Sequence, residues 1–219
     1  MDKRKNYYLV IDTETANTLD NPIVFDIGGA VVDKKGEVYE TFSFIVDEVF
    51  YGMPDLMAKC FYVSKLSDYV IDIMNNKRIV KHWFDIKKHI TDVCERWDIK
   101  AVMAHNAAFD SRAVNTTQRY ITKSAYRFFL PYGVELWDTL KMAQDTICKQ
   151  KTYCRWCGEN GYLKQNGAPR ATAEILYRYI SGNNDFVESH TGLEDVLIEK
   201  EIFAKCMAQH KKMKKKCWE

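Results

Sequence analysis

The segment YYLVIDTETA, residues 7–16, constrains the fold more than any other part of the sequence. Its first five residues are aromatic or aliphatic, which is typical of a short buried strand. Two acids, Asp12 and Glu14, then follow, and because side chains two apart on a strand share a face, both project together with Thr13 opposite. Carboxylates at the end of a core strand are costly unless something positive meets them. The segment therefore predicts either a solvated strand edge or a place where a hard cation such as Mg²⁺ or Mn²⁺ binds.

The segments that follow predict a mixed α/β fold. Residues 23–33 and 37–46 have the pattern of two strands joined by a turn at Gly36, which makes a hairpin, and residues 64–97 change to helical spacing. The other expected elements are a strand over 101–105, a helix over 108–120, a strand over 128–137, a helix with Asp138 as its N-cap, a helix over 172–180 and a last helix over 191–209. This order predicts a mixed five-stranded sheet with helices on both faces.

Composition limits the class of protein without naming one. The chain has 219 residues, 47% hydrophobic and 28% charged, which is ordinary for one globular domain with insertions or two small ones. No apolar run approaches the roughly 18–20 residues of a membrane span, and the stretch MDKRKNYY has no signal-peptide core. The seven cysteines are irregularly spaced and odd in number, so a disulfide framework is not expected. We expect a cytoplasmic protein with no membrane partner.

The net charge of +2 does not by itself indicate a nucleic-acid-binding protein. Residues 210–219, HKKMKKKCWE, form a basic tail with five lysines. The tail could contact phosphates, or it could be a solvated, frayed helix end.

Two further segments carry acids beside expected buried elements. In MAHNAAFD, Asp110 lies in the first turn of a helix that follows a short strand, where it could line a site or cap the helix. In ESHTGLEDV, Thr191 and Glu194 predict a capping box, which puts His190 just outside the last helix. Asp195 follows, held by an apolar stripe of Leu193, Val196 and Leu197. His190 could be a surface residue or a general base poised near neutral pH.

Together, DTET near the N-terminus, HNAAFD in mid-chain and His190 followed by Asp195 resemble the three exonuclease motifs of the DEDD superfamily, histidine subclass. The resemblance extends from Leu9 to about Ala208. It is strongest to proofreading-type 3′→5′ exonucleases, including those encoded by bacteriophages.

The resemblance implies a ribonuclease H-like fold, with residues 1–219 as a single exonuclease domain. It implies that Asp12, Glu14, Asp110 and Asp195 bind two divalent cations, Mg²⁺ or Mn²⁺, and that His190 is the general base. It implies further that the terminal nucleotide contacts Thr13, Thr15, Asn106 and Phe109. The substrate would be the single-stranded or frayed 3′ end of DNA, with RNA as the alternative. A polymerase could be a partner, and a phage-encoded member would act in the host cytoplasm.

Residues 149–170 depart from the compact family pattern and are expected to be a loop insertion. Cys154 and Cys157 form a Cys-x-x-Cys with Cys148 upstream, which could be part of a zinc site or simply a set of reduced thiols. The segment is also basic and aromatic, and it could guide a single strand by stacking bases, or it could be merely solvated. The residues that would do so are Tyr153, Trp156, Tyr162, Lys149, Lys151 and Arg155.

Two other functions fit the same residues. One is an RNA-trimming 3′→5′ exoribonuclease or oligoribonuclease, because the sequence identifies no contact to a 2′-hydroxyl. The other is a non-catalytic nucleic-acid-binding module that keeps the fold. Retention of all four acids and His190 favours an enzyme over such a module.

Overall fold

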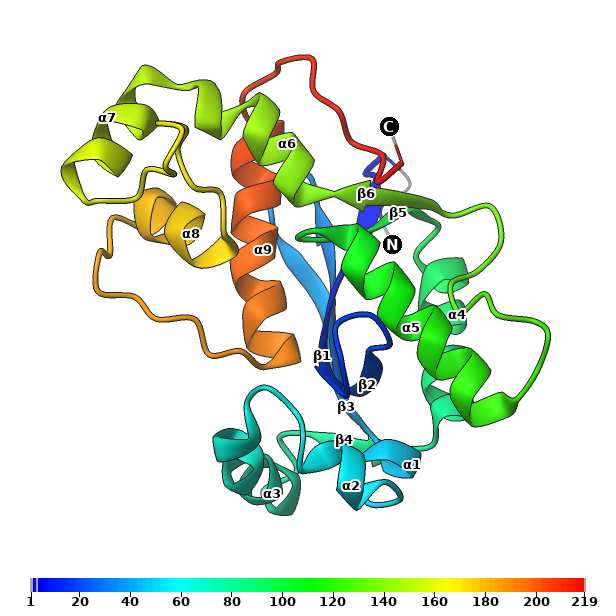
Figure 1. The fold of residues 1–219 in the computed structure, drawn as a ribbon. Coiled ribbons are helices and arrows are strands. Elements are labelled where there is room, and N and C mark those ends of the chain that lie inside the picture. The colour runs from blue at the N-terminus through cyan, green and yellow to red at the C-terminus, as the bar shows by residue number, and fades with distance from the viewer. Residues whose placement is uncertain (1, 3, 219) are drawn as a thin grey trace.

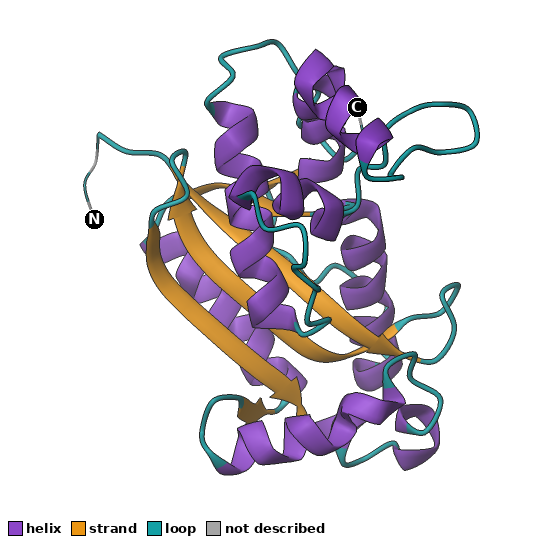
Figure 2. Ribbon diagram, turned by 90° about the vertical axis from the view of Figure 1, so that its left-hand side faces the viewer, coloured by secondary structure: helices purple, strands orange, loops and turns teal. Residues whose placement is uncertain are grey.

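The computed structural model describes residues 2 and 4–218, and a six-stranded mixed sheet with helices on both faces forms its centre (Figure 1, Figure 2). Across the sheet the strands lie in the order β4-β3-β2-β1-β5-β6. In chain order they are β1 (Tyr7–Ala16), β2 (Ile23–Asp33), β3 (Val38–Val46), β4 (Ile79–Lys81), β5 (Ile99–Ala104) and β6 (Glu135–Asp138). Strands β1, β2 and β3 are antiparallel neighbours, whereas β5 is parallel to both β1 and β6, and β4 is parallel to β3.

The mixed sheet with flanking helices confirms the predicted α/β class, but the expected number of strands was one too few. The additional strand, β4, lies inside the stretch 64–97 that was expected to be helical, and it pairs with Phe44–Val46 of β3. Three residues are too few for the period-two alternation that identifies a strand in a sequence. The strand expected over 128–137 is also shorter than predicted, because only its end forms β6.

The predicted hairpin of β2 and β3 is confirmed. Gly36 has a φ of +80°, and its N–H donates to the carbonyl oxygen of Asp33 at 2.9 Å. This is a backbone region that glycine enters without steric cost. Every residue of β2 is buried because helices cover both faces of the sheet.

The helices divide into two layers. They are α1 (Asp47–Phe50), α2 (Pro54–Met57), α3 (Leu66–Met74), α4 (Trp83–Arg96), α5 (Ala107–Thr122), α6 (Thr139–Asp145), α7 (Lys151–Glu159), α8 (Ala173–Ser181) and α9 (Gly192–Met207), with 3-10 turns at Val63–Lys65 and Ile147–Lys149. Leu9 and Ile11 of β1 pack in one core with residues of α4 and α5. Tyr8 and Val10 pack in the other with residues of α6, α8 and α9. Alternate side chains of β1 thus pack against the helix layers on opposite faces of the sheet.

Two glycines bring α9 onto the sheet next to Asp12. Gly28 of β2 pairs with Asp12 of β1, and Gly192 is the first residue of α9. A Cβ atom on Gly28 would lie 2.2 Å from the carbonyl carbon of Gly192, so the backbones can approach this closely only with glycine here. The first turn of α9 is therefore fixed above the acid-bearing end of β1.

Residues 149–170 are not the expected loop, since α7 occupies much of the segment. Cys157 is fully buried, Cys148 and Cys154 are half-buried, and the Cys154 thiol donates to the carbonyl oxygen of Cys148 at 3.3 Å. Periodicity was obscured in the sequence because the buried face of α7 consists of a tyrosine and a cysteine among charged residues.

The aromatic side chains of this segment are also placed differently from the expectation. Tyr153 is fully buried, and its hydroxyl donates to the carbonyl oxygen of Arg170 at 2.6 Å, so it is not free to stack on a base. Trp156 packs against Tyr162 and Tyr179 at centroid distances of 5.3 and 5.4 Å. These rings hold α7 against α8.

The basic tail is docked along β6, so the frayed helix end was the wrong alternative. The Cys217 N–H donates to Leu136 O at 2.9 Å, and the Asp138 N–H donates to Lys215 O at 2.8 Å. Cys217 is buried, and Lys216 forms an ion pair of 2.7 Å with Glu135.

Within the described residues, no helix has both the length and the apolar character needed to cross a membrane.

Candidate active site

Asp12 and Glu14 line a cavity of about 750 Å³ at the carboxyl end of β1. They lie on the face of the strand that α9 covers, as the two-residue spacing predicts. His190 and Asp195 line the same cavity. Segments that are distant in the sequence therefore meet at this end of the sheet.

Asp110 lies next to the site in the opposite layer, but it does not line the cavity. It lies in the first turn of α5, which follows β5 through Asn106 in a left-handed conformation with φ of +71°. The Thr13 hydroxyl donates to Asp110 Oδ1 at 2.8 Å, and both side chains are buried. Because Asp110 and Glu14 each raise the pKa of Asp12, their carboxylates belong to one electrostatic cluster.

Asp195 is held at the start of α9 by two donors. The Ser189 hydroxyl donates to its Oδ1 at 3.2 Å, and the backbone N–H of Thr191 donates to its Oδ2 at 3.1 Å. The predicted capping box is therefore not formed, because the Thr191 side chain accepts no backbone N–H of α9. The Thr191 hydroxyl does meet Glu194, at 2.8 Å, but the Thr191 N–H that the box would assign to Glu194 goes to Asp195.

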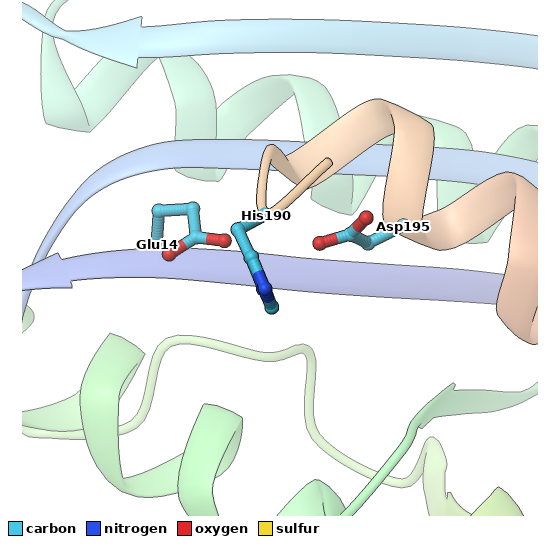
Figure 3. Close-up of side chains that lie close together, drawn as sticks. All are labelled: Glu14, His190 and Asp195. Carbon is cyan, nitrogen blue, oxygen red and sulfur yellow. The ribbon is translucent and has the colours of Figure 1, made fainter. Parts of the chain in front are cut away.

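His190 lies between Glu14 and Asp195, and its ring projects past their carboxylates (Figure 3). Ligand atoms of these three residues lie within 4.8 Å of one another. The ring stacks on Tyr62 with a centroid distance of 4.3 Å and an interplanar angle of 13°. The backbone of His190 has a φ of +52°, an uncommon value for a residue with a side chain. The stacked Tyr62 ring and the backbone conformation of His190 together restrict the orientation of the imidazole.

Burial and mutual repulsion dominate the electrostatics of these acids. Burial, followed by the charge of Asp195, raises the pKa of Glu14 to about 9. Burial also raises the pKa of Asp110 and that of Asp195 to about 7 each. The pKa of Asp12 is raised well above its usual value, first by burial and then by neighbouring carboxylates. These directions apply to the protein without a bound cation, and a cation would reverse them.

The imidazole of His190 has the opposite tendency. Burial, and then the positive charge of Lys65, lower its pKa. A neutral ring at neutral pH has a free lone pair that can accept a proton or bind a cation.

The site fits divalent cations by its chemistry. Its donors are carboxylate oxygens, the ligands that Mg²⁺ and Mn²⁺ prefer. In the described part of the chain, Asp12, Glu14, Asp110 and Asp195 form no ion pair with a lysine or arginine, whereas the buried Asp26 and the half-buried Glu174 and Glu194 do. A cluster of this kind needs positive charge from a ligand to be fully ionised.

The four residues expected to contact a nucleotide are placed unequally. Asn106 lines the cavity and is exposed, so it can reach a ligand. Thr13 is buried and its hydroxyl donates to Asp110, so it orients that carboxylate. Phe109 is half-buried with the Arg112 guanidinium 5.6 Å from its ring centroid, and Thr15 is half-buried at an irregularity in the β1–β2 ladder. Neither lines the cavity.

Several cavity residues were not found from the sequence. They are Tyr62, His105, Lys164, Arg170, Glu188 and Glu199. Glu199 could have been found from the sequence, because it lies four residues after Asp195 and so shares its helix face. The others come from loops and turns whose place depends on tertiary packing.

Another acid, Asp26 of β2, anchors the N-terminal end of α9, close to Asp195. It accepts hydrogen bonds from the Gly192 N–H at 2.9 Å and the Tyr69 hydroxyl at 2.7 Å, and it forms an ion pair of 3.3 Å with Arg78. Arg78 also contacts Glu194 at 2.8 Å. This network fixes the helix that carries Asp195.

Comparisons with known proteins identify solved structures with a similar fold, but no family model or curated protein with a similar sequence. No family model matches the chain, and no curated protein matches it. Among solved structures, E. coli exonuclease I in complex with a 5cy-dT13 oligonucleotide is 12% identical, with 90% of this chain and 39% of that chain covered and a TM-score of 0.52. Exonuclease I in complex with inhibitor BCBP is 14% identical, with 95% and 42% covered and a TM-score of 0.51.

This chain covers about two fifths of the length of those exonuclease I chains. It has the α/β, ribonuclease H-like fold that they share, which confirms the predicted fold class. At these identities the similarity establishes the fold, and the chemistry has to be argued from the site.

Proposed function

We propose that this protein is a metal-dependent 3′→5′ exonuclease that hydrolyses DNA to 5′-mononucleotides. One observation carries the proposal. Carboxylates from β1 and α9 line one cavity with His190, Asp110 of α5 acts on Asp12 from behind that lining, and Asp12, Glu14, Asp110 and Asp195 form no ion pair with a lysine or arginine in the described residues. The fold is that of the exonuclease I structures, and those bound to oligonucleotides are consistent with a nucleic-acid substrate.

The four carboxylates would hold two divalent cations, which when bound supply charge stabilisation to the attacking and leaving oxygens of a phosphodiester. His190 accepts a proton from the attacking water at its unprotonated ring nitrogen. The water oxygen forms the new bond to phosphorus, the bond from phosphorus to the 3′-oxygen breaks, and the shortened strand leaves with a 3′-hydroxyl. Tyr62 keeps the imidazole in position, and the burial that lowers the pKa of His190 keeps the ring neutral before the step.

Other cavity residues suit the substrate. Lys164 and Arg170 line the cavity and offer positive charge to the phosphates next to the scissile bond. Asn106 lines it too and offers an amide to a sugar or base. The expected polymerase partner and cytoplasmic setting remain predictions.

The test is digestion of 5′-labelled single-stranded DNA and RNA of one sequence, with Mg²⁺, Mn²⁺ or chelator. We expect a ladder that shortens from the 3′ end on DNA and disappears with chelator. A ladder on RNA alone would replace this function by an exoribonuclease. Binding with no product on either strand, with or without cations, would instead indicate a non-catalytic module.

A further inference from the structure

Glu199 is a buried acid that the mechanism above does not use. It lies on α9 one turn after Asp195, and 3% of its surface is exposed. It nevertheless lines the cavity beside Asp12 and Glu14. Its carboxylate is thus directed toward the site, although water reaches very little of it.

The two oxygens of Glu199 are in different situations. The backbone N–H of His105 donates to the carboxylate, while Oε2 has no hydrogen-bond partner. The His105 ring is itself held in place, with Nδ1 3.0 Å from Thr139 Oγ1 and Nε2 2.7 Å from Ala171 O. The donor is therefore fixed, and the second oxygen is left without a partner. Buried polar atoms without partners are rare in native proteins, and a bound ion or water is one explanation for them; in the described residues Asp26 Oδ1 and His89 Nε2 are others, but only Glu199 lines the cavity.

The charges around Glu199 are all of the wrong sign to stabilise it. Asp110, Asp195 and Glu188 are the charges that act on it most strongly, and each is negative. In turn, Glu199 is the charged neighbour with the largest effect on Asp12. A carboxylate placed among carboxylates is tolerated when it shares their cation.

We propose that Glu199 is a fifth carboxylate of the metal centre and that its Oε2 holds, directly or through a bound water, the cation that Asp12 and Asp110 bind. The inference rests on the proposed function, because it needs the cation that this function requires. The alternative is a permanently protonated, structural acid. That alternative leaves Oε2 without an acceptor among the described residues.

The test is titration of Mn²⁺ into Glu199→Gln by calorimetry, without nucleic acid. The amide keeps the shape and can still accept from His105, but it removes the charge. We expect two sites in the unmodified protein and about a 10–100-fold loss of affinity at one of them in the variant, the range seen when a supporting group of a metal site is removed. The matched control is Glu201→Gln on the same helix, whose side chain is 41% exposed and pairs with Lys200. It should bind Mn²⁺ unchanged.

Thermal unfolding gives a second readout that a purely structural role would not produce. In chelator, Glu199→Gln should melt at or above the temperature of the unmodified protein, because a repelling charge is gone. With saturating Mn²⁺ its melting temperature should rise by less. Unchanged Mn²⁺ affinity together with a lower melting temperature in chelator would overturn the proposal.

A second variant and the unmodified protein complete the test. If Glu199→Gln does not fold, Glu199→Asp keeps the charge but withdraws it by one methylene. It should weaken the same site, and unchanged affinity would overturn the proposal. If the unmodified protein binds two Mn²⁺ ions and the variants bind them with equal affinity, this inference alone is overturned. No Mn²⁺ binding in the unmodified protein would overturn both this inference and the proposed function.

Discussion

Two groups of buried or half-buried acids lie near the start of α9, and their environments differ. The paired cluster consists of Asp26, Asp72 and Glu194 around Arg78, whose side chain is 2% exposed and contacts all three at 2.8–3.3 Å. The open cluster consists of Asp12, Glu14, Asp110, Asp195 and Glu199, which make no ion pair with a lysine or arginine in the described residues. The first set has its neutralising cation within the protein, although Asp26 Oδ1 has no hydrogen-bond partner, whereas the second set has no such cation in the described residues.

The pKa values of Glu194 and Glu14 show the same difference, although burial raises the pKa of Asp26 in spite of its partner Arg78. Burial acts to raise the pKa of Glu194, but hydrogen bonds from Arg78 and Lys77 outweigh it and lower that pKa to about 2. Burial raises the pKa of Glu14 to about 9, and the nearest charges, which are also carboxylates, add to the effect. Paired acids therefore serve the fold, and open acids are available to a ligand. The difference predicts opposite outcomes for the same kind of substitution in the two clusters.

The largest effect is expected from Asp12→Asn in the open cluster. Loss of a metal ligand should reduce DNA cleavage by roughly 10³-fold or more, equivalent to several kcal/mol of lost transition-state stabilisation. Folding in chelator should be no weaker, because one repelling charge is removed. Initial rates with Mg²⁺ and melting in chelator measure both. Asp72→Asn in the paired cluster is the matched control and should retain activity. Cleavage above a tenth of the unmodified rate in Asp12→Asn would contradict the ligand assignment.

His190→Ala should lower turnover by roughly 10²–10⁴-fold, the range for a general acid–base group, with little change in fold. Unlike Asp12→Asn, it should leave Mn²⁺ binding largely intact, since its proposed role is to take a proton. Single-turnover cleavage and Mn²⁺ calorimetry separate the two roles. Near-normal turnover would remove His190 from the mechanism, and loss of a Mn²⁺ site would make it a ligand.

Arg78→Met tests the paired cluster through stability. Removing the cation leaves Asp26 buried and uncompensated, so the free energy of unfolding should fall by about 3–5 kcal/mol. Urea denaturation measures the change. The double variant Arg78→Met with Asp26→Asn should regain part of the loss, because it removes both charges. No recovery in the double variant would show that the charge pair is not the cause.

The pH dependence of stability in chelator should follow the open cluster. An acid whose pKa is raised on folding contributes no penalty below its unfolded pKa and a growing penalty as pH rises through its folded pKa. For Asp110 and Asp195, with folded pKa values of about 7, stability should fall between about pH 4 and pH 7, and for Glu14 the fall continues to about pH 9. The melting temperature should drop by several degrees over this range, as about 1 kcal/mol moves it by 2–4 °C in a domain of this size. Saturating Mn²⁺ should flatten the slope, and an unchanged slope would show that the acids are not the cation site.

The sequence was a good guide where one short pattern determines the outcome. β1, the hairpin of β2 and β3, and Asp138 as the N-cap of α6 follow from local alternation, turn chemistry and capping. The meeting of Glu14, His190 and Asp195 was expected from the resemblance of their segments to the exonuclease motifs.

The sequence failed where a tertiary partner determines the outcome. β4 is a strand only because β3 is beside it, and the basic tail is ordered only because β6 offers a free edge. The assignment of Leu197 to the buried stripe of the last helix was wrong, since this residue is 39% exposed. Glu199 lies on the buried face of that helix. Arg78 could not be paired with Asp26 in advance because 52 residues separate them.

The smallest effect is expected from Thr13→Val, which sharpens the comparison within the open cluster. The variant keeps the side-chain shape but removes the hydroxyl that orients Asp110, and hydrogen bonds to charged groups contribute about 1.5–3 kcal/mol. We expect cleavage to fall roughly tenfold with weaker Mn²⁺ binding and an unchanged Michaelis constant for DNA, since a fall of tenfold corresponds to about 1.4 kcal/mol. Thr15→Val, at a half-buried position outside the cavity, is the matched control. If Thr15 contacts the nucleotide, its variant changes the Michaelis constant and leaves Mn²⁺ binding alone. If both variants instead change only the Michaelis constant, Thr13 acts on the substrate and the orientation of Asp110 does not limit the reaction.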